Sequence, residues 1–228
     1  MFARGACFVL AAVVAAQDPV VFGDDAARGL FDRARAAIVH TGKIADLRTL
    51  VLRGRVRFAD RELDRDGDVE IKILLPDHFL RVDRVEGTIR RSGFAGRTLL
   101  SDGGDLSSER ARFARLMLGA ALYAAPDEKL AVRSTGEDPF PNTQAVDLKG
   151  PSFAGRLVFD ASSLVPLRIL YFGDRGVSTI VSFADRRRAG GLEFPFRVAT
   201  QTNERVLETL MFDDVLVNPP LDKGEFVR

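Results

Sequence analysis

Residues 155–216 form a series of short segments in which apolar and polar side chains alternate, and each segment ends at turn residues. Successive side chains of a strand point to opposite faces of a sheet, so each segment offers one apolar face. The intervening turns, at residues 161–163, 173–176 and 189–191, are rich in Gly, Ser and Asp. Closely spaced strands with such turns form hairpins, and several hairpins in a row form a meander, sandwich or barrel. The stretch therefore predicts a large antiparallel sheet.

The first 16 residues have the pattern of a secretory signal peptide. Arg4 provides a positive start, residues 6–16 are apolar, and small residues stand at 14–16 before Gln17. The apolar run is too short to cross a bilayer, which needs about 20 residues; an uncleaved anchor or a buried helix are the alternatives. Cys7 is the only cysteine and would leave with the signal peptide. We therefore expect a periplasmic mature chain without disulfides, folded as one domain over residues 17–228.

The composition restricts the class of partner. The chain has 33 Lys and Arg against 32 Asp and Glu, and a protein that binds nucleic acid generally carries a clear basic excess. It has 17 Phe and no Trp, which suits an apolar interior better than an exposed stacking surface. We therefore expect no nucleic-acid partner.

The N-terminal part predicts a helix at 24–41, capped by Asp24 or Asp25, and a strand at 47–59. Arg53, Arg55 and Arg57 alternate along that strand. A solvated outer face of the sheet explains this row better than an anion site. The acidic stretch at 64–68 resembles a calcium loop, but its glycine is misplaced and Leu75 stands where a bidentate Glu is needed. An Asp-Gly hairpin turn is the better interpretation.

A second helix is predicted over residues 106–125, with Asp105 as its cap and Pro126 at its end. Its apolar residues recur at helical spacing on a wide face, and such a helix must be largely buried. Two interpretations remain open for it, plain core packing and a lid over a ligand cavity.

No motif for catalysis is present. The two histidines, His40 and His78, stand in no metal-binding pattern, and the sequence contains no nucleophile elbow and no phosphate-binding loop. Acidic pairs such as Asp213-Asp214 are explained by solvated turns or helix caps. We therefore expect no catalytic residue, no metal and no cofactor, and the chain is predicted not to be an enzyme.

Five stretches, in order, resemble a known family. They are HTGKIADLRTLVLRGRVRF (40–58), ILLPDHFLRVD (73–83), GRLVFDASSLVPLRILYF (155–172), FADRRRAGGLEFPFRVAT (183–200) and VLVNPPLDKGEF (215–226). Their pattern resembles the periplasmic proteins related to LolA and LolB, the carrier and receptor that sort outer-membrane lipoproteins. The stretch 93–101 lacks the Trp that the family often has there.

This resemblance implies an α+β fold: an incomplete, strongly curved antiparallel β-barrel with helices covering its concave face. It implies a cavity that holds the acyl chains of a lipid or lipoprotein, and possible membrane-bound donor or acceptor proteins. We expect a monomeric lipid-binding or carrier protein. The alternative is a periplasmic sensor or protein-interaction module built on the same half-barrel.

The expected apolar lining combines one face of the second helix with one face of the strands, although a register error of one residue would exchange the two strand faces. The predicted lining residues are Phe113, Leu116, Met117, Ala120, Leu157, Phe159, Leu167, Ile169, Phe183, Phe194 and Phe196.

Overall fold

The computed structural model of the protein describes most of the chain after residue 19. The described ranges are 20–59, 64–101, 103–125, 129–135, 140–151, 154–173, 176–202 and 205–227. The predicted signal peptide at 1–16, with Cys7, lies outside them. Within these ranges no helix combines the length and the apolar character needed to cross a membrane.

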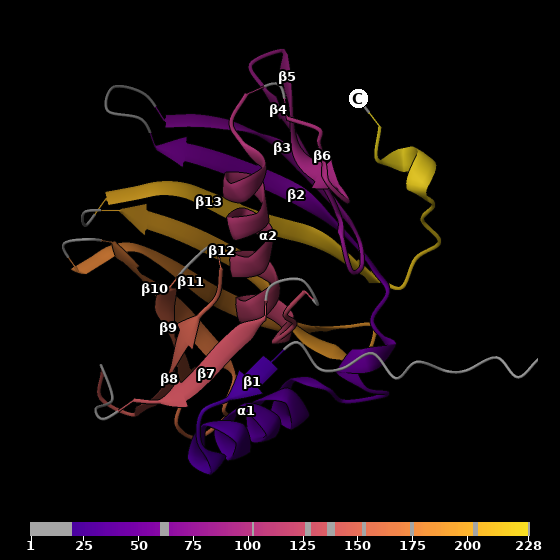
Figure 1. Cartoon of the computed structure of the whole chain (residues 1–228). Helices are drawn as coiled ribbons and strands as arrows, with labels where there is room; N and C mark the ends of the chain where they lie inside the picture. Colours follow the sequence, from indigo (N-terminus) through magenta and orange to yellow (C-terminus); the bar gives the residue numbers. More distant parts are fainter. Residues whose placement is uncertain are drawn as a thin grey trace, which may run out of the picture.

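The described residues form one large sheet, two α-helices and two short 3₁₀ helices (Figure 1). The helical elements are α1 (Asp25–Ile38), η1 (Ile44–Asp46), α2 (Leu106–Ala121) and η2 (Lys223–Glu225). The strands are β1 (Val20–Phe22), β2 (Thr49–Ala59), β3 (Asp64–Leu74), β4 (His78–Val85), β5 (Thr88–Ala95), β6 (Thr98–Leu99), β7 (Leu130–Ser134), β8 (Thr143–Lys149), β9 (Ala154–Asp160), β10 (Pro166–Gly173), β11 (Gly176–Ala189), β12 (Leu192–Thr202) and β13 (Arg205–Val217).

The 13 described strands follow the order β1-β7-β8-β9-β10-β11-β12-β13-β2-β3-β4-β5-β6. All neighbours are antiparallel except β1 and β7. The sheet is strongly curled and its two edges, β1 and β6, do not pair with each other (Figure 1). The prediction of a curved, unclosed antiparallel sheet is therefore confirmed.

The predicted meander corresponds to β9–β13. Gly190 and Gly191 connect β11 to β12 with φ angles of +52° and +84°, a conformation that glycine adopts without strain. The Asp160 carboxylate accepts hydrogen bonds from the backbone amides of Ser162 and Ser163, at 3.0 and 2.8 Å, and this orders the turn between β9 and β10. Local turn chemistry thus accounts for both connections.

The prediction of a hairpin turn at 64–68 is wrong. These residues form the first part of β3, where Gly67 is paired with Val56 on one side and Val85 on the other. A Cβ atom at Gly67 would lie 2.3 Å from the carbonyl oxygen of Arg84. The glycine is therefore needed for close approach of two strands and not for a turn.

The exposed arginines of β2 lie on the outer face, as predicted. Arg53 pairs with Glu70 at 2.8 Å and Arg57 with Asp66 at 2.9 Å, across the β2–β3 ladder. Such solvated cross-strand pairs explain the arginine row without a ligand.

Helix α1 begins as predicted and ends earlier. The Asp24 carboxylate accepts a hydrogen bond from the backbone amide of Ala27 at 2.7 Å, which identifies Asp24 as the cap. The helix ends at Ile38, before the predicted residue 41, because Val39 forms a β-bridge with Leu192. Pairing with the sheet replaces the last helical turn.

Helix α2 connects β6, at one edge of the sheet, to β7, which is next to the opposite edge. Its 16 residues span about 24 Å at 1.5 Å per residue. In Figure 1 the helix lies across the curled sheet, and it packs against β5, β10, β11 and β12. Asp105 caps it as predicted, but it ends at Ala121 and not at 125, because Leu122 adopts a left-handed conformation.

The main core joins both helices to one face of the sheet, which we call the apolar face and define by Leu157, Phe159 and Phe194. A smaller cluster lies on the opposite face, where Phe226 is buried against Leu80 and Val82. Phe226 thus packs the segment after β13 onto the sheet. The short parallel strand β1 was not predicted.

Candidate ligand-binding site

The C-terminal half of α2 is in direct contact with the sheet. A Cβ atom at Gly119 would lie 1.8 Å from Cζ of Phe183 on β11, so the ring packs against the bare helix backbone. Phe183 is 3% exposed. The small residues Ala120 and Ala121 follow and are also buried. Glycine and alanine therefore bring this part of α2 close to the sheet; we call it the packed end of α2.

The half-buried Arg186 of β11 connects the packed end to the sheet. Its guanidinium donates hydrogen bonds to the carbonyl oxygens of Gly119 at 3.1 Å, Pro166 at 2.6 Å and Glu193 at 3.2 Å. Burial lowers the pKa of Arg186 to about 10, and Glu193 opposes this shift. One side chain thus connects α2 to β10 and β12, and the three carbonyl groups offset part of the loss of hydration.

At Arg112, Arg115 and Leu116, α2 faces a cavity of about 270 Å³ that lies between these residues and the sheet; we call this stretch the open end of α2. The cavity is lined mostly by apolar side chains of six strands and by three residues of α2. The lining residues are Phe58, Ile71, Phe79, Arg81, Arg112, Arg115, Leu116, Val181, Val198, Thr200, Leu207, Glu208 and Leu210.

The β-strand period explains the apolar wall. Val198 and Thr200 follow Phe196 on β12 at intervals of two. Phe79 on β4 pairs with Ile73 on β3, and Ile71 lies two residues from Ile73 on the same face of β3. Ile71 and Phe79 are each 1% exposed, whereas Leu207 is 41% exposed at the rim. The cavity therefore has a buried apolar floor and a rim that reaches solvent.

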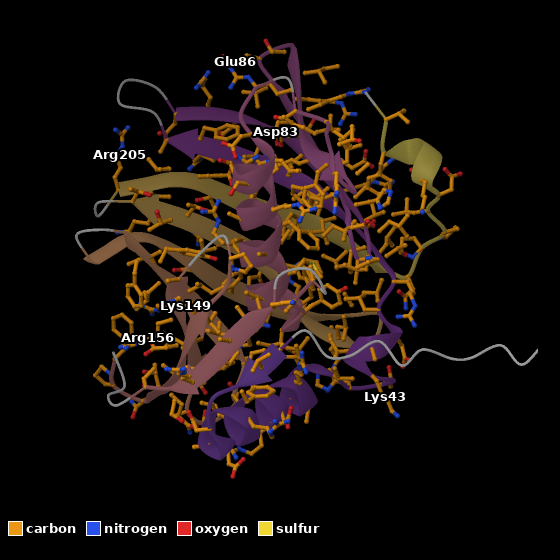
Figure 2. All side chains as sticks on the ribbon, in the orientation of Figure 1. Lys43, Asp83, Glu86, Lys149, Arg156 and Arg205 are labelled. Carbon is orange, nitrogen blue, oxygen red and sulfur yellow. The ribbon has the colours of Figure 1, made fainter. Side chains whose placement is uncertain are left out.

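A buried ion-pair network forms one wall. Arg81 donates to the Asp83 carboxylate from Nε at 2.8 Å and to the Glu208 carboxylate from Nη2 at 2.7 Å. Burial by itself would raise the pKa of Glu208, but Arg81 outweighs it and the pKa is lowered. The charges of Arg81 and Glu208 therefore compensate each other in the cavity wall. In Figure 2 Asp83 lies within the outline of the molecule, while Glu86 and Arg205 lie at its periphery.

Arg112 and Arg115 extend toward the cavity from adjacent turns of α2. Arg112 is 3.5 Å from Glu109 and donates to the hydroxyl of Ser92 at 3.0 Å. The Arg115 guanidinium lies 5.3 Å from the centre of the Tyr171 ring, and among the described residues it has no carboxylate within ion-pair distance. Burial lowers the pKa of Arg115.

Of the predicted lining residues, Leu116 lies in the cavity wall. Phe113 lies behind that wall, where its ring centre is 5.8 Å from that of Phe79 and 5.6 Å from that of Phe94. Leu167 is half-buried. It lies at a β-bulge in the pairing of β10 with β9, where the alternation of side chains between the two faces of the sheet is interrupted. The others are buried side chains of the main core, outside this cavity: Met117, Ala120, Leu157, Phe159, Ile169, Phe183, Phe194 and Phe196.

Sequence reasoning missed most of the lining. Val181 and Val198 continue the alternation that contains Phe183 and Phe196, so the period could have identified them. The pairing of Arg81 with Glu208 joins residues separated by 127 positions, and no local pattern predicts it.

Each histidine contacts one carboxylate, His40 that of Glu193 at 3.0 Å and His78 that of Asp77 at 2.8 Å. Within the part of the chain that the structure describes, no three His, Cys, Asp or Glu residues are grouped so that they could hold a metal ion.

Solved structures share this fold. The LolA superfamily protein NE2245 from Nitrosomonas europaea aligns with a TM-score of 0.63 and 11% identity, over 89% of this chain and 97% of that chain. A putative outer membrane lipoprotein-sorting protein domain from Vibrio parahaemolyticus aligns with a TM-score of 0.52 and 9% identity, over 89% and 96% of the two chains. A DUF1329 family protein from Desulfovibrio piger gives a TM-score of 0.55 and 8% identity, over 89% and 98%.

The chain therefore has the fold of LolA superfamily proteins, and the resemblance predicted from its sequence is confirmed at the level of the fold. At these identities the likeness establishes the fold alone. No protein-family model and no curated protein matches the sequence.

Proposed function

We propose that the protein binds an acyl chain of a lipid or lipoprotein, or of another amphiphile, and carries it non-covalently through the periplasm. The observation that supports this most directly is the apolar cavity of about 270 Å³ between the open end of α2 and the sheet. The fold shared with a lipoprotein-sorting domain agrees with it.

In this proposal α2 is the cover of the half-barrel's concave face. Its packed end acts as a fixed support, and its open end lies over the bound chain. The protein is exported by the signal peptide at 1–16, acts as a monomer, and exchanges its cargo with a membrane-bound donor or acceptor protein. Binding does not require a catalytic residue, so we propose a carrier and not an enzyme.

The physical basis is burial of apolar surface. Transfer of one CH₂ group from water into an apolar site contributes about 0.8 kcal/mol. A chain that fills the cavity therefore supplies several kcal/mol against the loss of translational freedom on binding. Contact with Ile71, Val198 and Leu210 requires no directional bond, which permits a carrier to release its cargo unchanged.

The test is a binding titration with dodecanol, an uncharged chain that probes the cavity alone. Isothermal titration calorimetry measures binding to the parent protein, which contains no Trp, and to its Trp variants alike. Val198→Trp places a large ring in the cavity wall, and we expect it to weaken dodecanol binding at least about tenfold by displacing several CH₂ groups.

The matched control is Leu216→Trp on the next strand, β13, where the side chain is 38% exposed and lies outside the cavity. It is expected to bind like the parent protein. Unchanged binding in Val198→Trp with the fold intact would exclude this cavity as the site. A parent protein that binds no chain would favour the alternative, a sensor or protein-interaction module.

A further inference from the structure

The charged side chains in the cavity wall are unevenly compensated. Three arginines, Arg81, Arg112 and Arg115, line the cavity with one carboxylate, Glu208. Arg81 already contacts both Glu208 and Asp83, at 2.7 and 2.8 Å. The positive charge of Arg81 is thus compensated by the protein, and Glu208 is engaged by it.

The arginines of α2 are in a different situation. Arg112 is 43% exposed and 3.5 Å from Glu109, so it is partly compensated and reaches solvent. Arg115 is half-buried and has the Tyr171 ring as its neighbour. In the described ranges no carboxylate lies within ion-pair distance of it, and Glu208 and Glu109 act on its charge only from farther away. A cation partly removed from water without an ion-pair partner is unfavourable, and an anion brought by a ligand would relieve that cost.

We infer that the ligand is a single-chain amphiphile with an anionic head, whose chain fills the cavity and whose head pairs with Arg115, assisted by Arg112. The inference rests on the proposed function and specifies its ligand. The guanidinium of Arg115 presents a planar set of donors that suits a carboxylate or a phosphate. The apolar floor at Ile71 and the exposed rim at Leu207 define the direction of the chain, with the head near the rim.

The size of the cavity limits the chain. A cavity of about 150 Å³ accommodates benzene, so 270 Å³ corresponds to roughly ten carbon atoms. One chain of that length fits, and two do not. Affinity is therefore expected to rise about fourfold per added CH₂ up to roughly ten carbons, and to level off beyond that.

The experiment compares four ligands that share one dodecyl chain: dodecanoate, dodecyl phosphate, dodecanol and dodecyltrimethylammonium, each below its micellar concentration. We expect both anions to bind at least about tenfold more tightly than the alcohol, as for a hydrogen bond to a charged group, and the cation to bind more weakly than the alcohol. The tighter of the two anions assigns the head as a carboxylate or a phosphate.

The decisive variant is Arg115→Gln, which is expected to reduce the preference for the anions, measured as the ratio of their affinities to that of dodecanol, to less than about threefold. Arg115→Lys keeps the charge and is expected to retain most of the preference. Arg53→Gln is the control, because Arg53 is an exposed arginine of the outer face paired with Glu70. Thermal unfolding of each variant verifies the fold.

Equal binding of dodecanol and dodecanoate by the parent protein would overturn the inference and leave the proposed function standing. A preference for anions that survives in both Arg115→Gln and Arg112→Gln would also overturn it. If none of the four ligands binds, the proposed function itself fails. The two failures are therefore distinguishable.

Discussion

The two ends of α2 meet the same sheet in different ways. At the packed end, Gly119 and its alanine neighbours allow the Phe183 ring to touch the helix backbone, and Arg186 ties the helix to two strands. At the open end, Arg112, Arg115 and Leu116 face a cavity. Small side chains thus make a rigid contact where stability is needed, and long ones leave a space that a ligand can occupy. Stability and binding are expected to be separable along one helix.

The largest expected effect is at the packed end. Phe183→Ala removes a buried ring from a close-packed contact and is expected to lower the free energy of unfolding by about 3–5 kcal/mol. Leu207→Ala, at the exposed rim of the cavity, is expected to change it by less than about 0.5 kcal/mol. Urea unfolding of both variants measures the difference. Similar losses would show that the two ends do not differ in packing.

Arg186→Met removes the donors for three carbonyl groups at the packed end. We expect a loss of about 2–3 kcal/mol, since buried acceptors without partners are unfavourable. Binding of dodecanol should change little once the variant is folded, because Arg186 does not line the cavity. An Arg186→Met variant with the parent's free energy of unfolding that no longer binds dodecanol would contradict the separation of the two ends.

Gly119→Ala tests the close approach itself. Alanine favours helices over glycine by about 1 kcal/mol, yet its Cβ would meet the Phe183 ring, and overpacking of this kind costs about 1–3 kcal/mol. We therefore expect a net destabilisation. The matched control is Gly29→Ala in α1, where the nearest atom is the end of the flexible Arg33 side chain at 3.3 Å. That variant is expected to be stabilised, and opposite signs in the two melting temperatures would confirm the comparison.

The smallest effect is electrostatic and lies away from both ends of α2. Hydrogen bonds from the hydroxyl and backbone amide of Ser134 lower the pKa of Asp24 from its usual 3.8 to about 2. The folded form therefore prefers the carboxylate, and this stabilisation is present above about pH 4 and is lost as the pH falls toward 2.

Asp24→Asn should reduce the decline of the urea midpoint between pH 4.5 and pH 2.5. Asp25→Asn is the control, because it removes the same charge one residue away without removing the bonds to Ser134. An identical pH profile for the parent protein and Asp24→Asn would contradict the assignment.

The sequence predicted the strands and turns of β9–β13 because alternation and turn residues are local signals. It did not predict β1, which is three residues long and pairs with β7 more than 100 positions away. It misplaced a turn at 64–68, since Gly67 serves a strand contact that only the neighbouring strand reveals. Local chemistry was informative, and long-range pairing was not.

The candidate site was harder to predict than the fold. Leu157 and Phe159 belong to the core cluster that includes both helices, whereas Val158 between them belongs to a separate cluster. The position of the cavity on that face depends on how closely α2 approaches each strand, and this follows from the contact between Gly119 and Phe183, which no periodicity reveals. The pairing of Arg81 with Glu208 likewise depends on long-range strand pairing. It requires the registers by which β13 pairs with β2, β2 with β3, and β3 with β4.

The central claim is that the open end of α2 holds one apolar chain. The most direct measurement is native mass spectrometry with lipid extraction, on the parent protein and on Val198→Trp, each purified without detergent and then incubated with dodecanoate. The account predicts a single adduct on the parent protein at a ratio of one to one, and little or none on Val198→Trp. A parent protein that stays empty, or a variant that retains the adduct with its fold intact, would contradict it.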